Sequence, residues 1–152
     1  MNGLLELLSV LALAGSGLVA GVLFAVAISV MPALLAMPPD RYVFTHKLLG
    51  RHYDRVMPFI VAGSTLIDVF LAVQAEQPER RALFVVAAVF MAGVAAVSQT
   101  KNVPINNRVK ALEPDGIPAG WQDPRIAWRN WNLVRMAFAM AGCLATGAAV
   151  VA

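Results

Sequence analysis

The sequence is poor in charge, cysteine and histidine. Of its 152 residues, 14% are charged and 59% are hydrophobic, and the chain has one cysteine and two histidines. A soluble domain carries about 25% charged and roughly 45–50% apolar residues, so this composition excludes an ordinary soluble domain. The single cysteine, Cys143, cannot form an internal disulfide. At this length we expect one domain, residues 1–152.

Several common catalytic and binding patterns are missing as well. The chain has no HExxH, CxxC, GxGxxG, P-loop or GxSxG pattern. It also has no basic run long enough to bind nucleic acid. The first forty residues contain no Arg or Lys, and Glu6 stands where a secretory signal would carry positive charge. We therefore interpret the N-terminus as a retained helix, with a cleaved signal as the alternative.

What the sequence does contain is long apolar runs. A membrane helix needs about 20 mostly apolar residues, and four segments qualify, near residues 4–31, 56–73, 82–98 and 133–151. The sequence thus predicts an all-α, integral-membrane four-helix bundle in a lipid bilayer. The first run exceeds one crossing, so we expect a tilt or a break, with Pro32 as the break point. Small residues at four-residue spacing suit close packing within the bundle or in a homo-oligomer.

The basic residues are unevenly distributed among the connections. Residues 38–55 hold four of the 12 Lys and Arg and residues 99–132 hold five, whereas the connection between the second and third spans has only Arg80 and Arg81. The positive-inside rule then predicts a protein of the cell inner or plasma membrane, with loops 38–55 and 99–132 cytoplasmic and both termini outside. We expect 99–132 to be a long loop that caps the cytoplasmic end, because Pro104 blocks helix continuation.

Polar side chains are costly in or beside apolar spans, so we examine them as candidate functional groups. Asp68 lies inside the second span, where it is either a functional carboxylate or a hydrogen-bonded tie between helices. Arg135 lies one turn into the fourth span. On a helix, Trp128, Asn132 and Arg135 share one stripe, and Trp131 can pack against the guanidinium. Interfacial anchoring is the alternative for the tryptophans.

A second polar group, Asn106, Asn107 and Arg108, follows Pro104. These amides and the guanidinium can bind an oxygen-rich ligand at the membrane boundary. Alternatively, at least one of the two asparagines caps a helix or bonds loop backbone.

The two histidines give a poor metal signature. His46 and His52 are six residues apart, a spacing that does not put both rings on one helix face. We predict no metal site, while convergence of His46, His52 and Asp68 in three dimensions stays open. His46 precedes an apolar Leu48-Leu49 pair, and it is the better candidate base of the two.

Several runs resemble the anthrone oxygenase family of small four-span membrane proteins, and the resemblance extends over nearly the whole chain. They are Asn102-Val103-Pro104-Ile105-Asn106-Asn107-Arg108, Trp131-Asn132-x-Val134-Arg135, Val30-Met31-Pro32-Ala33-Leu34 and Arg55-Val56-Met57-Pro58. The resemblance implies oxidation of anthrones to anthraquinones in polyketide pathways, without a known flavin or haem. One departure matters, because Leu133 stands where the family pattern commonly has a histidine.

The leading hypothesis is therefore a membrane oxygenase that uses O₂ on a lipophilic aromatic or polyketide-like substrate, with no cofactor. Its catalytic residues would be His46, Asp68 and Arg135, with the base being His46, Asp68 or a phenolate of the substrate. The substrate-binding residues would be Asn106, Asn107, Arg108, Trp128, Trp131 and Asn132. This hypothesis predicts a closed pocket at the cytoplasmic end. The alternatives are a non-catalytic membrane scaffold or accessory protein, and a proton- or small-molecule-handling protein built around Asp68.

Overall fold

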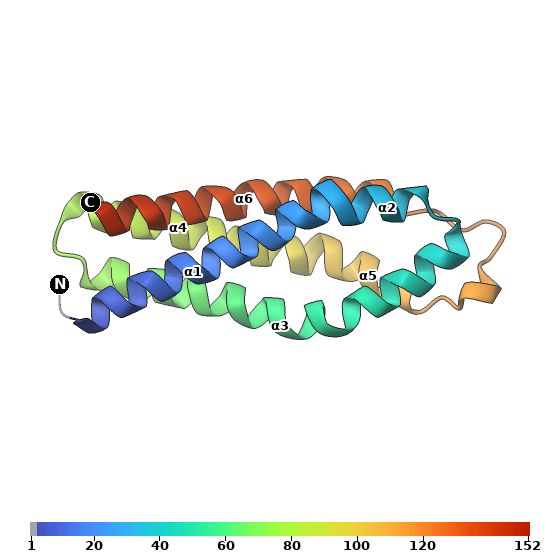
Figure 1. Cartoon of the computed structure of the whole chain (residues 1–152), viewed down its shortest axis with the longest axis horizontal. Coiled ribbons are helices and arrows are strands. Elements are labelled where there is room, and N and C mark those ends of the chain that lie inside the picture. The colour runs from blue at the N-terminus through green and yellow to red at the C-terminus, as the bar shows by residue number, and fades with distance from the viewer. Residues whose placement is uncertain (1–2) are drawn as a thin grey trace.

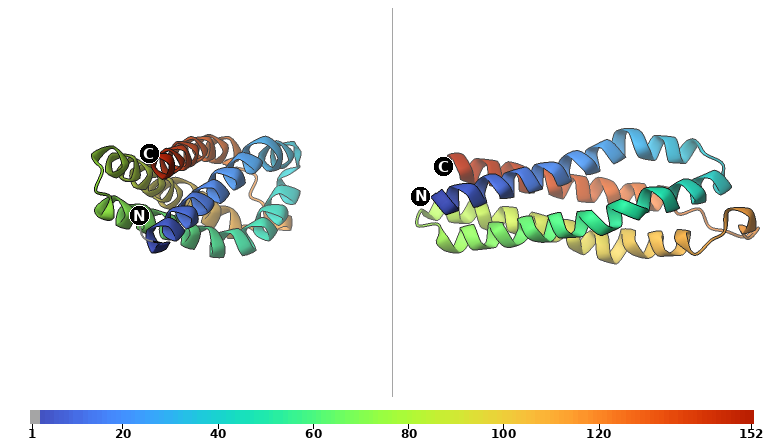
Figure 2. Two further views of the ribbon diagram at one scale, coloured as in Figure 1. Left: turned by 60° about the vertical axis from the view of Figure 1, so that its left-hand side comes forward. Right: turned by 60° about the horizontal axis from the view of Figure 1, so that its bottom comes forward.

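Four long helical rods run antiparallel in an elongated bundle. The structure is a computed structural model that describes residues 3–152. By length and composition, each rod can cross a membrane: Gly3–Ala36, Pro39–Gln74, Pro78–Lys110 and Arg125–Val151. The N- and C-termini lie at one end, and the connection 111–124 lies at the other (Figures 1 and 2). The predicted all-α, four-span architecture is confirmed.

The first and third rods each combine α-helix with a π-helical segment. The first consists of α1 (Gly3–Ala25), the π segment η1 (Val26–Val30) and α2 (Met31–Ala36). The second rod is α3 (Pro39–Gln74). The third consists of α4 (Pro78–Val97), the π segment η2 (Ser98–Asn102) and α5 (Val103–Lys110). A 3₁₀ turn, η3 (Pro114–Gly116), lies in the last connection, and α6 (Arg125–Val151) is the fourth rod.

The long loop predicted over residues 99–132 is wrong in its extent. Helix continues to Lys110 and resumes at Arg125, so the connection is residues 111–124. Segment 38–55 is likewise helical rather than a loop, since α3 begins at Pro39. The prediction failed at Pro104 because a π-helical segment, η2, directly precedes α5 and keeps the rod continuous through this proline.

Both π-helical segments end two residues before a proline. Val30 ends η1 ahead of Pro32, and Asn102 ends η2 ahead of Pro104. A proline ring clashes with the carbonyl four residues earlier, and a wider π turn is one way to relieve that clash. The break expected at Pro32 is therefore a π segment in a continuing rod. A proline alone does not require a π segment, because Pro58 lies within α3, which is α-helical throughout.

The rods pack in a square, in which α6 contacts α4 and α1, and α3 contacts the same two. Close approach depends on small residues: a Cβ on Gly142 would lie 3.2 Å from Met91 Cγ. Many large apolar side chains point outward instead, including Phe59 and Leu144. An outer surface of this kind is suited to lipid. At the end that carries the 111–124 connection, the core consists of Met31, Leu34, Tyr42, Val43, Ile105 and Val109.

Candidate functional site

The predicted stripe on α6 comes together around Arg135. Its Nη2 donates to Asn132 Oδ1 (2.9 Å) and its Nη1 to Ser98 Oγ in η2 (3.2 Å). The guanidinium carbon lies 5.4 Å from the Trp128 ring centroid. Asn132 is fully buried and donates in turn to the Leu23 carbonyl at 3.3 Å. The stripe therefore binds α6 to the first rod on one side and to η2 on the other.

Asn102, the last residue of η2, contacts the same stripe. Its side chain is 0% exposed, and Nδ2 donates to the Trp128 carbonyl at 3.2 Å. Within residues 3–152, two buried polar atoms of this region have no hydrogen-bond partner, Asn102 Oδ1 and Arg135 Nε. Buried polar atoms are rarely left unpaired, so these two are candidates for contact with a further group, such as water or a ligand.

Asn106 links the stripe to His46. Its Oδ1 accepts a 2.7 Å hydrogen bond from Trp128 Nε1, and its side chain is close enough to interact electrostatically with the His46 ring. His46 is buried in α3, with its ring 5.5 Å from that of Tyr42. The polar region around Arg135 on α6 thus extends toward a histidine on α3. We name this set the Arg135 cluster: His46, Ser98, Asn102, Asn106, Trp128, Asn132 and Arg135.

Three of the predicted binding residues lie outside the cluster. Asn107 and Arg108 are exposed, and Arg108 Nε donates to the carbonyl of Pro104 in its own helix at 3.4 Å. Trp131 faces Lys101, whose Nζ lies 5.0 Å from the ring centroid. The ring that packs on Arg135 is Trp128, not Trp131 as one interpretation had it.

Asp68 is also separate from the Arg135 cluster. It is 0% exposed, and Thr146 Oγ1 lies 3.3 Å from its Oδ1. It follows His46 by 22 residues on α3, a span of about 33 Å at the α-helical rise of roughly 1.5 Å per residue. Thr146 lies about 16 Å beyond Arg135 on α6 by the same rise. His46 and Asp68 therefore cannot serve one reacting centre together.

The residues considered for a metal do not converge. His52 is exposed, whereas His46 and Asp68 are buried far apart on the same helix. Across residues 3–152, no three His, Cys, Asp or Glu side chains gather as metal ligands would.

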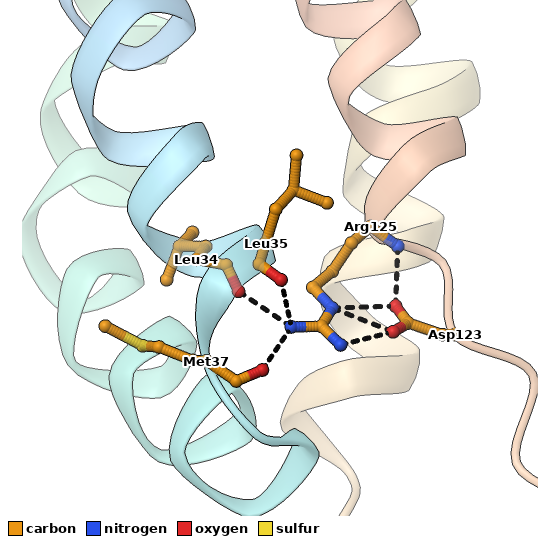
Figure 3. A network of polar contacts seen from close by, with 5 residues as sticks. All are labelled: Leu34, Leu35, Met37, Asp123 and Arg125. Atoms are coloured by element: carbon orange, nitrogen blue, oxygen red, sulfur yellow. Dashed lines mark hydrogen bonds and ion pairs between the residues drawn. The ribbon is translucent and has the colours of Figure 1, made fainter.

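An ion pair between the buried Arg125 and the exposed Asp123, which sequence reasoning missed, fixes the start of α6. Arg125 Nη1 donates to the carbonyls of Leu34 and Met37, both at 2.7 Å, and to that of Leu35 at 3.5 Å (Figure 3). Asp123 binds the other edge of the guanidinium, with Nε to Oδ2 at 2.8 Å and Nη2 to Oδ2 at 2.5 Å. Arg125 thereby provides hydrogen-bond donors to carbonyls at the C-terminal end of α2. Its positive charge also interacts favourably with the helix dipole at that end.

The charge of Asp123 is maintained by this contact. Burial alone would raise the pKa of its carboxyl, but the hydrogen bonds and positive charge of Arg125 hold that pKa below its usual range. Because Arg125 lies one helical turn before Trp128, the ion pair also sets where the stripe on α6 begins.

Two hollows lie away from the cluster. An open groove of about 660 Å³ runs between α3 and α4 and is lined by residues such as Thr65, Val69 and Val89. A hollow of about 440 Å³ lies at the end that holds the termini, beside Gln74 and Phe84. Neither hollow is the closed pocket that we expect at the end of the bundle with the 111–124 connection. That pocket stays a prediction.

Comparison with known proteins gives one match. A family model described as anthrone oxygenase matches residues 46–145, a range that contains every member of the Arg135 cluster. Comparisons with curated proteins and with solved structures give no match.

Proposed function

Because this chain belongs to the anthrone oxygenase family, we propose that it is an integral membrane oxygenase acting with O₂ on a lipophilic aromatic or polyketide-like substrate. The observation that carries the proposal is the Arg135 cluster. It brings a base, amides and a cation together against an aromatic ring at one end of a four-span bundle. O₂ and such a substrate both partition into lipid, so both can reach the bundle from the bilayer.

The proposed reaction converts an aromatic ring methylene into a carbonyl, CH₂ + O₂ → C=O + H₂O. A base removes one methylene proton and leaves an electron-rich anion whose charge is delocalised onto the ring oxygen. The anion forms a C–O bond to O₂ and gives a peroxide. Loss of the remaining C–H proton and cleavage of the O–O bond then give the carbonyl and water. The proposal invokes no resident cofactor.

Within the cluster, we assign to Arg135 the role of stabilising the substrate anion. The hydrogen-bond partners of Arg135 are the neutral Ser98 and Asn132, and the one carboxylate of the described residues that acts on it electrostatically, Asp54, is itself paired with Lys110. Preorganised donors of this kind stabilise developing negative charge in a water-poor site. Trp128 provides an apolar wall. A structural scaffold role would instead need Arg135 matched by carboxylates or loop carbonyls.

His46 is the proposed base. It is buried, and Asn106 connects it to the wall residue Trp128. A neutral imidazole is a suitable proton acceptor near neutral pH, whereas Asp68 lies too far along α3 to reach the same substrate. Leu133 is 40% exposed. The family resemblance implies a histidine at this position, which lies outside the cluster. Having leucine there leaves the contacts within the cluster intact.

We also propose the orientation that the basic residues favour, with the 111–124 connection cytoplasmic and both termini outside. The rod ends next to that connection carry most of the lysines and arginines, as the positive-inside rule requires. The Arg135 cluster would then lie toward the cytoplasmic half of the inner or plasma membrane.

Aerobic incubation of membranes with an anthrone tests the function. We expect O₂ uptake that depends on the protein and is abolished by Arg135→Ala. Membranes without the protein provide the background, because anthrones oxidise slowly unaided. If no phenolic substrate gives protein-dependent uptake, the proposal is wrong.

A further inference from the structure

We infer that Asn102 and Arg135 form a two-point binding site for one phenolic hydroxyl of the ligand. Asn102 Oδ1 accepts the hydroxyl proton, and Arg135 Nε donates to the hydroxyl oxygen. This inference rests on the proposed function for its location, and it adds Asn102 to the residues that touch the ligand.

The first observation is the unpaired amide oxygen of Asn102. The side chain is fully buried, and its one hydrogen bond uses Nδ2, which donates to the Trp128 carbonyl. That bond fixes the amide plane, so Oδ1 cannot turn toward solvent. Within residues 3–152 this oxygen has no donor. A buried acceptor without a donor is unfavourable, and a ligand O–H removes that cost.

The second observation is the unpaired Nε of Arg135. The two Nη atoms are occupied by Ser98 and Asn132, and only Nε, which is also buried, lacks an acceptor in the described residues. One free acceptor and one free donor are the complement of a single hydroxyl group, which donates once and accepts through its lone pairs.

Local geometry places the two atoms in one region. Ser98 and Asn102 are the first and last residues of η2, and both face α6, where one bonds Arg135 and the other bonds Trp128. Trp128 is itself stacked with Arg135. The donor and the acceptor therefore belong to side chains that both contact Trp128, an arrangement suited to recognition of a phenol. π-helical turns within α-helices are frequent at functional sites, and η2 supplies both side chains here.

A pair of probes in which the same oxygen carries either a hydrogen or a methyl group tests the inference. 2-Naphthol can donate and accept, whereas 2-methoxynaphthalene can only accept. We would measure binding of each probe to the purified full-length protein in nanodiscs and subtract binding to empty nanodiscs. We expect the hydroxyl probe to bind roughly tenfold more tightly, the effect of one net hydrogen bond. In Asn102→Leu this preference should disappear, and in the control Thr146→Val, a buried polar residue far from the cluster, it should persist.

Equal binding of the two probes by the wild-type protein would overturn the inference and would show that the two atoms hold only water. So would an unchanged preference in Asn102→Leu. If that variant does not fold, the wild-type comparison still decides. Oxygen uptake on an anthrone, measured on the same preparation, separates the two proposals. Uptake without hydroxyl preference refutes the two-point site alone, whereas preference without uptake supports the site and refutes the oxygenase.

Discussion

The bundle contains two buried polar regions of different construction, the Arg135 cluster and the Asp68–Thr146 pair. The cluster joins four elements, α3, η2, α5 and α6, and it retains an unpaired donor and an unpaired acceptor. The pair joins only α3 and α6, both in regular α-helical turns, and the Asp68 carboxylate has Thr146 as a donor. The Asp68–Thr146 pair is therefore a structural tie, whose polar groups bond each other. The Arg135 cluster is a candidate site, because some of its polar atoms have no partner.

Backbone geometry accounts for much of this difference. The cluster lies at the level of the two π segments, each followed by a proline that a regular α-helix accommodates poorly. The Asp68 half has close helix packing and small residues, such as Gly142 against Met91. Irregular helix thus occurs in the half that we propose for chemistry, and regular helix in the half that holds the bundle together.

The largest effect that distinguishes the two regions is expected for His46→Asn. An asparagine is polar and of similar size but cannot take up a proton, so we expect the rate of O₂ uptake to fall about 10²–10⁴-fold. The rate constant for uptake at saturating anthrone is the measurement. A rate within twofold of wild type would assign the proton transfer to another group, such as the substrate's own phenolate.

Arg125→Met should give the largest loss of stability. The substitution leaves the carbonyls of Leu34, Leu35 and Met37 without this donor and removes the partner of Asp123. Because the guanidinium is buried but Asp123 is exposed, we expect a loss of about 1–3 kcal/mol, the cost of unpaired buried acceptors, measured as the free energy of unfolding in detergent. Arg129→Met is the matched control, because Arg129 bonds only the neighbouring Asn130 side chain. Equal losses in the two variants would refute a special role for Arg125.

Thr146→Val should affect stability and leave catalysis unchanged. The Thr146 hydroxyl has one proton and two acceptors within reach, the Gly142 carbonyl at 3.1 Å and Asp68 Oδ1 at 3.3 Å. Its loss should therefore cost about 1 kcal/mol, the net value of one hydrogen bond. O₂ uptake per folded molecule should stay within twofold of wild type, and the same holds for Asp68→Asn. A large fall in O₂ uptake for either variant would show that the Asp68–Thr146 pair also takes part in catalysis and would contradict this distinction.

The smallest effect concerns Asp123 and pH. Its folded-state pKa is below the ordinary value, so its contribution to stability is complete above the unfolded pKa of about 3.9 and is lost as pH falls through the lower, folded-state pKa. Asp123→Asn should lower stability at pH 7 slightly and flatten its acid dependence, as followed by thermal melts from neutral to acid pH. Parallel curves for the variant and the wild type would contradict this account.

The sequence was sufficient for the four spans and for the α6 stripe, because hydropathy and a 3.6-residue period act locally. It failed at Pro104, which we interpreted as a helix stop, because the π-helical segment that precedes this proline keeps the rod continuous. The role of Arg125 was also invisible, since its carbonyl partners lie about 90 residues earlier in the chain. Ser98 and Asn102 are neutral, and nothing in a linear pattern shows that Arg135 and Trp128 lie beside them.

The central claim is that O₂ reacts with the substrate in the presence of the Arg135 cluster, and isotope labelling tests it most directly. Membranes holding the protein are incubated with an anthrone under ¹⁸O₂, and the quinone product is analysed by mass spectrometry. We predict one ¹⁸O atom in the new carbonyl, in an amount well above that from membranes without the protein and reduced to that background by Arg135→Ala. Labelled product equal to background in the wild-type sample would contradict the account.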